Sequence, residues 1–131
     1  MSYATQVASY REMEILSASP ERLVVLLFDH LVIHLHRVQL AIEGNDVTLR
    51  TTSLGKARGI VSELLSTLDF EKGGRIAKDL QSLYGFLLGE MADVGLHRDA
   101  RKVARLKMIA EELRIGFTGA AASVVPVKRP A

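Results

Sequence analysis

The spacing of proline residues constrains the fold more than any other feature of this sequence. The chain has 131 residues and three prolines, Pro20, Pro126 and Pro130. Because proline breaks the interior of a helix, the uninterrupted stretch from residue 21 to 125 permits long helices. No regular alternation of apolar and polar residues, the pattern typical of half-buried strands, appears in it. The sequence therefore predicts an all-α protein.

Capping signals divide this stretch into four helices. Ser19 followed by Pro20 is a helix start, and Gly44-Asn45 is a helix end. Asp46 and Asp99 provide two further N-caps, and the segment "DFEKGG" (69–74) interrupts the chain between them. The expected helices span about 20–43, 47–68, 75–94 and 100–122. Four such helices with short connections predict an antiparallel up-down four-helix bundle.

The chain is short enough to form one domain. We expect residues 1–17 to be a mobile N-terminal arm and residues 18–122 to form the bundle. The last segment, 123–131, has too little to bury and is expected to be disordered.

Composition argues against several classes of protein. The net charge is +2 and the basic residues are scattered among acidic ones, which disfavours a nucleic-acid-binding face. The absence of cysteine fits a cytoplasmic chain. The N-terminus shows no secretory signal, and no run of 18 apolar residues predicts membrane insertion. No phosphate-binding loop, nucleophile elbow or isolated carboxylate pair occurs, so we expect neither an enzyme nor a cofactor.

The first helix carries more apolar residues than one buried face needs. Seven of them share the expected core face, whereas Leu26, Ile33 and Leu40 repeat every seven residues on roughly the opposite side. Either this helix is central and touches two neighbours, or the second line is an exposed groove for a partner helix. The residues leave both interpretations open.

The second and third helices each pair an apolar face with a face of small residues. The expected inward residues are Leu49, Ala57, Ile60, Val61, Leu64 and Leu68 of the second helix, with Ile76, Leu80, Leu83, Tyr84, Leu87 and Met91 of the third. The small faces comprise Thr52, Gly55, Gly59, Ser62, Ser66, and Ser82, Gly85, Gly89, Ala92. Glycine inside a helix costs roughly 1 kcal/mol relative to alanine. Either another helix approaches closely at these faces, or the bundle tolerates the glycines.

Two histidines allow an alternative hypothesis. His30 and His34 are four residues apart on one helix, a spacing that can chelate a metal ion. The residues between them include no glutamate, and no Glu-x-x-His pair is present. A ligand- or metal-binding bundle therefore stays the alternative, and a self-associating bundle that forms a homodimer is a third hypothesis.

Three segments together resemble a known family. "YREMEILSASPERLVVLLFD" (10–29), "LDFEKGGRIAKDLQSLYGFL" (68–87) and "GLHRDA" (95–100) resemble, in order and spacing, the signatures of the FliS family of flagellar secretion chaperones. The resemblance extends from about residue 4 to 120.

The resemblance implies a function as well as a fold. FliS chaperones are antiparallel helical bundles that hold the disordered C-terminal segment of flagellin in the bacterial cytosol. Holding this segment blocks premature polymerisation and helps deliver the subunit to an export gate component of the type III export apparatus. Such recognition would be helix-in-groove binding coupled to folding of the partner.

Residue by residue, the resemblance places Tyr10 at the family's N-terminal tyrosine, and Tyr84 and Phe86 at a later aromatic pair. The wheel places Phe28 and Tyr84 in the core and Phe86 at the surface. Together with the apolar and small faces, this gives the expected partner-binding residues: Tyr10, Leu26, Ile33, Leu40, Gly55, Gly59, Ser62, Ser66, Gly85 and Phe86.

The sequence departs from the family pattern at three places. His30 stands where the family usually has glycine, Gly89-Glu90 where it commonly has two arginines, and Phe117 where it usually has tryptophan. The lost basic pair puts in doubt any charge contact made by the outer face of the third helix.

Overall fold

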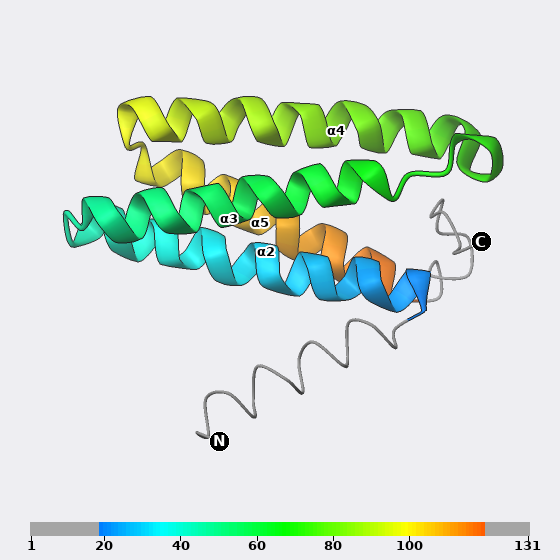
Figure 1. The fold of residues 1–131 in the computed structure, drawn as a ribbon, viewed down its shortest axis with the longest axis horizontal. Coiled ribbons are helices and arrows are strands. Elements are labelled where there is room, and N and C mark those ends of the chain that lie inside the picture. Colours follow the sequence, from blue (N-terminus) through cyan, green and yellow to red (C-terminus); the bar gives the residue numbers. More distant parts are fainter. Residues whose placement is uncertain (1–18, 120–131) are drawn as a thin grey trace, which may run out of the picture.

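The computed structural model describes residues 19–119, which form four helices. Consecutive helices run antiparallel (Figure 1), so the predicted four-helix bundle is confirmed. The expected arm at 1–17, including Tyr10, and the expected tail at 123–131 lie outside the described residues. The helices are α2 (Pro20–Glu43), α3 (Val47–Ser66), α4 (Phe70–His97) and α5 (Ala100–Thr118).

The helix starts follow the capping chemistry of the sequence. The Ser19 hydroxyl accepts a hydrogen bond from the backbone N–H of Arg22 at 3.2 Å, and Pro20 occupies the first turn. Asp46 accepts from Leu49 N–H at 2.9 Å, and Asp99 accepts from the first turn of α5. These bonds satisfy N–H groups that no helix can satisfy internally, so the helix starts predicted at these three positions are confirmed.

The break expected at "DFEKGG" is narrower than predicted. Asp69 caps a helical turn that begins at Phe70, and only Gly74 leaves the helical conformation, with φ 48° and ψ −121°. That conformation suits glycine, because a Cβ would clash with the backbone there. The third predicted helix therefore starts five residues earlier, with a kink at Gly74. The fourth helix ends at Thr118, where Gly119 is the C-cap.

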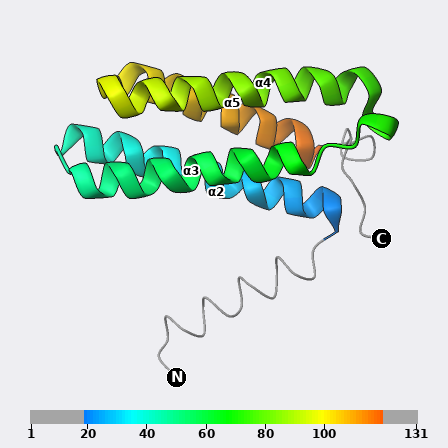
Figure 2. The ribbon, with the colours of Figure 1, turned by 45° about the horizontal axis from the view of Figure 1, so that its top comes forward.

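Helix α2 is the central element of the bundle. It packs against α3 on one side and α5 on the other, whereas α4 contacts α3 and α5. In both views α2 and α4 lie on opposite sides of the molecule (Figure 2). Helix α2 therefore touches two neighbours, and these leave part of its surface uncovered at Ile33 and Leu40.

Aromatic side chains fill the middle of the core. Phe28 and Tyr84 are 0% and 1% exposed, with ring centroids 6.3 Å apart. Phe117 stacks on Phe28, with ring centroids 5.4 Å apart and an interplanar angle of 22°. Burial raises the pKa of the Tyr84 hydroxyl.

The helical wheel misplaced two residues near helix ends. Leu49 and Ile76 were expected to face inward, yet they are 36% and 55% exposed. Both lie within the first two turns of their helices, where neighbouring helices cover less surface. Leu54 and Ser53 are buried instead, although the wheel did not place them in the core.

One described helix, α2, is long and apolar enough to span a membrane by length and composition. A central helix of a soluble bundle passes the same test, because it is apolar on more than one side. Here α2 packs against both α3 and α5.

Candidate partner-binding face

The candidate site is the surface along α2 and α3, which we call the α2–α3 face. It comprises the exposed α2 residues Ile33 and Leu40, the small residues of α3, and a hollow between the two helices. Ile33 and Leu40 are 43% and 49% exposed, so two members of the predicted apolar line are accessible. Gly55, Gly59, Ser62 and Ser66 of α3 are all exposed as well.

Leu26, the third member of the predicted line, is only 7% exposed. It does not belong to the main core cluster. The line for which the sequence left both interpretations open is therefore covered at Leu26 and accessible at Ile33 and Leu40. Its role in partner binding stays a prediction.

The hollow between α2 and α3 has a volume of about 350 Å³. Leu27 and Ile60 provide much of its apolar wall, and Gly59 leaves room on the α3 side. Charged and polar side chains complete the lining of the hollow. The lining residues are Leu27, His30 and His34 of α2, with Lys56, Gly59, Ile60 and Glu63 of α3.

His34 is the unusual polar residue of the hollow. Its Nδ1 atom is buried and has no hydrogen-bond partner among the described residues. Burial lowers the pKa of His34, and the nearby positive charges of Arg37 and Lys56 and the His30 ring lower it further. The ring is therefore held neutral near pH 7.

The glycines of the α3 surface are not required by the packing of the bundle. A Cβ added at Gly55 or Gly59 would meet no heavy atom within 4 Å, and neither residue has a positive φ. Alanine would fit at both positions and would favour the helix. Their presence is consistent with close approach by a partner, although tolerance of glycine explains it as well.

The structure does not bring all predicted site residues together. Gly85 and Phe86 belong to α4, a helix that packs against α3 and lies across the bundle from α2 (Figure 1). Phe86 is 51% exposed, as the wheel predicted, and Gly85 has open space where a Cβ would stand. These two residues belong to a separate surface, the α4 outer face, which also includes Gly89.

An ion-pair network occupies the edge between α4 and α5. The Lys102 ammonium lies 2.6 Å from Asp93 and 3.1 Å from Glu90. Hydrogen bonding to Lys102, and secondarily to His97, lowers the pKa of Asp93. Glu90 thus pairs with α5 of its own chain.

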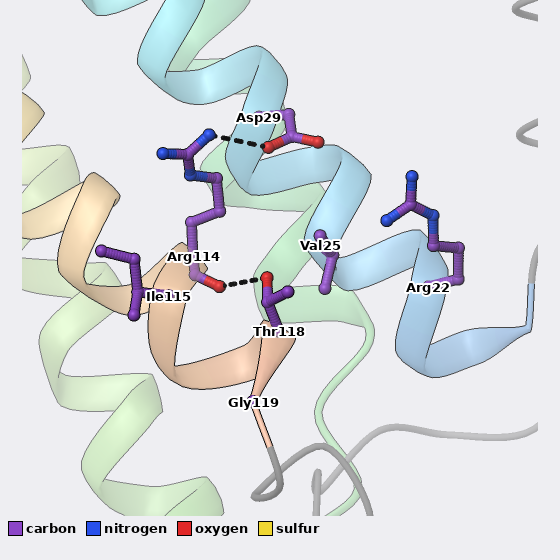
Figure 3. A pocket seen from close by; sticks show the side chains of 7 residues that line it. All are labelled: Arg22, Val25, Asp29, Arg114, Ile115, Thr118 and Gly119. Carbon is purple, nitrogen blue, oxygen red and sulfur yellow. Dashed lines mark hydrogen bonds and ion pairs between the residues drawn. The ribbon is translucent and has the colours of Figure 1, made fainter.

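Sequence reasoning missed a second hollow, between α2 and α5. Figure 3 shows Arg114 of α5 directed toward Asp29 of α2, and the two side chains are 3.4 Å apart. Val25 and Ile115 add apolar surface to this hollow of about 440 Å³. Ile115 is 66% exposed; the only sequence signal was its position on the outer side of α5.

The metal hypothesis gains no third ligand from the fold. Within residues 19–119, no group of three or more His, Asp or Glu side chains could hold a metal ion. His30 and His34 instead line the apolar hollow.

Comparison with known proteins identifies the family. The family described as "Flagellar protein FliS" matches residues 3–124. The chain belongs to the FliS family. The resemblance seen in the three sequence segments is thereby confirmed.

Curated relatives carry the same name. The flagellar secretion chaperone FliS of Salmonella typhimurium is 35% identical over 97 residues, covering 73% of this chain and 72% of the relative. The flagellar secretion chaperone FliSB of Pseudomonas aeruginosa is 27% identical over 108 residues, covering 82% and 86%. FliS of Vibrio cholerae is 27% identical, covering 79% and 76%. Membership places this chain among chaperones and not among enzymes.

Proposed function

We propose that this chain is a cytoplasmic export chaperone that binds the disordered C-terminal segment of flagellin. Binding prevents premature polymerisation of the subunit and aids its delivery to an export gate component of the flagellar type III export apparatus. Family membership supports the chaperone role. The partner, the delivery step and the cytoplasmic location are proposed on that basis.

The observation that carries the proposal is the accessible apolar surface of the α2–α3 face. Ile33 and Leu40 leave about half of their side-chain surface in water although both lie on the central helix. A hollow with a mainly apolar wall lies between α2 and α3. An amphipathic helix could bury its apolar side here and close against the small residues of α3.

The α4 outer face is proposed as a second contact of the same segment. Phe86 and Gly85 belong to α4, which packs against α3 and not beside α2, so a segment on α2 has to cross α3 or α5 to meet them. A segment that wraps around the molecule could contact both faces in succession. Ordering that segment consumes part of the interaction energy, so the complex would remain dissociable at the export gate.

A direct binding experiment tests the proposal. A peptide covering the C-terminal segment of the host's own flagellin is titrated into the full chain, followed by calorimetry and circular dichroism. We expect stoichiometric binding and a gain of helical signal. A flat titration at peptide concentrations on the order of tens of micromolar would contradict the proposal.

The two other hypotheses are tested in the same preparation. Metal analysis of the purified protein would support a metal-binding bundle if it found a stoichiometric ion. Sedimentation of the free chain would reveal a homodimer formed through its uncovered apolar surface. The geometry favours neither over the chaperone.

A further inference from the structure

The two nitrogen atoms of the His34 ring have different surroundings. Nδ1 is buried without a partner, whereas Nε2 is not among the buried unpaired atoms of the described residues. A buried N–H without an acceptor is rarer in proteins than an unsatisfied acceptor. We therefore assign the proton of the neutral ring to Nε2, so that His34 offers an N–H donor at the hollow that it lines.

The charges around this donor are predominantly positive. Arg37 and Lys56 act on His34, and neither has an ion-pair partner within residues 19–119. His30 adds a second imidazole on α2, and Glu63 of α3 is the one carboxylate among the residues that line the hollow. A negatively charged group from a partner would meet one hydrogen-bond donor and two cations.

The hollow also fixes where such a group would lie relative to an apolar anchor. Leu27 and Ile60 form the wall beside His34, and Gly59 has open space above it. On a bound helix, side chains three or four residues apart share one face. An apolar side chain in the hollow would thus place a neighbour one turn away near the His34 ring.

We propose that His34 is a specificity-determining residue of the α2–α3 face, whose Nε2–H donates a hydrogen bond to a carboxylate of the bound segment. The carboxylate belongs to an Asp or Glu one helical turn from an apolar residue that fills the hollow. This inference rests on the proposed function. It adds that the α2–α3 face selects a carboxylate as well as an apolar side chain.

The hydrogen bond between His34 and the carboxylate should make the affinity of the complex depend on pH. In the free chain the pKa of His34 is lowered. A carboxylate beside the ring stabilises the imidazolium form and raises that pKa, so binding takes up a proton. The complex therefore tightens as the pH falls, whereas a groove that read apolar shape alone would show no such linkage through His34.

The test uses the full chain and the flagellin C-terminal peptide. His34→Leu removes the donor and is expected to weaken binding about tenfold at pH 7, the effect of losing a charge-assisted hydrogen bond. His34→Gln keeps a neutral N–H donor and is expected to lose less affinity. The matched control is His36→Leu, the same exchange at an exposed position of α2 that lies toward α5 and Lys107.

Two further arms identify the bonded group. From pH 8 to pH 6 the wild-type complex should tighten by roughly threefold, and the His34→Gln complex should lose this pH dependence. Replacing each Asp or Glu of the peptide by its amide should reveal one whose effect disappears in the His34→Leu background. That coupling is the signature of a direct contact.

The possible outcomes distinguish a failure of this inference from a failure of the proposed function. Wild-type binding that His34→Leu leaves unchanged, or a set of peptide carboxylates none of which couples to His34, would overturn this inference while leaving the proposed function intact. Absence of any peptide binding to the wild-type chain would instead contradict the proposed function.

Discussion

The α2–α3 face and the α4 outer face look alike in sequence but differ in structure. Each combines exposed apolar side chains with two helix-interior glycines that have open space around them. Only the α2–α3 face adds a hollow with an apolar wall and a buried, unpaired polar atom. Small residues on a helix surface therefore do not define a binding site by themselves. A second helix must stand beside them to make a cleft.

The largest difference between the faces should appear when a charge is placed on α2. Ile33→Asp or Leu40→Asp should weaken binding of the flagellin peptide by about 30- to 100-fold, because a carboxylate would be buried in an apolar contact. Both sites are exposed in the free chain, so circular dichroism and the melting temperature should stay near wild type. Calorimetry gives the dissociation constants.

The matched control for this charge is Ile115→Asp on α5. Ile115 is also exposed and apolar but lies outside the proposed contacts. It should change affinity by less than about threefold. Equal losses at Ile33 and Ile115 would show that the α2–α3 face has no special role.

The second-largest difference between the two faces is expected when a glycine of each face is replaced by alanine. Gly59→Ala should weaken peptide binding by about tenfold if a partner helix approaches closely, whereas Gly89→Ala should leave it within about twofold. Both changes should raise the free energy of unfolding by about 0.5 to 1 kcal/mol, since alanine favours the helix and its Cβ meets no atom. Urea denaturation and calorimetry measure the two quantities. Tighter or unchanged binding by Gly59→Ala would favour mere tolerance of the glycine.

A smaller effect is expected at the α4 outer face. Phe86→Ala should weaken peptide binding by about three- to fivefold, because the exposed ring would contribute a peripheral contact of the wrapped segment. The stability of the free chain should hardly change, since the ring is 51% exposed. A loss of affinity as large as that of Ile33→Asp would contradict the expected difference between the two faces.

The smallest effect concerns the stability of the free chain with pH. The pKa of His34 is lowered in the folded state, so the unfolded chain binds the proton more readily as the pH falls. The stabilising contribution of the neutral ring is present above its ordinary pKa of 6.5 and is lost as the pH falls below that value. Comparing His34→Gln with wild type by urea denaturation at pH 7.5 and pH 5.5 should show a steeper decline for wild type. An equal decline of the free energy of unfolding in the two proteins would contradict this prediction.

Local signals in the sequence were sufficient for the architecture. Ser19, Asp46 and Asp99 cap helices through their own side chains, and Gly74 breaks a helix through its backbone conformation. Such effects depend on a few neighbouring residues and can therefore be predicted without the fold. The aromatic core at Phe28 and Tyr84 follows from helical periodicity in the same way.

The site was only partly predictable because it depends on how helices are placed beside one another. The wheel identified Ile33 and Leu40 but could not show that Leu26 is covered. His34 was noticed only as one of a pair with His30. Its position beside Gly59 and Ile60 exists only once α2 packs on α3. Likewise, helical periodicity placed Phe86 at the surface but could not show which neighbouring helix it lies beside.

The central claim is that the bound flagellin segment contacts the α2–α3 face. Backbone amide NMR of the isotopically labelled full chain, recorded with and without the flagellin C-terminal peptide, tests it most directly. The account predicts the largest shifts and exchange protection at residues 30–40 and 55–63, with smaller changes near Phe86. Saturating binding that perturbed α4 or α5 while leaving both of those segments unchanged would contradict it.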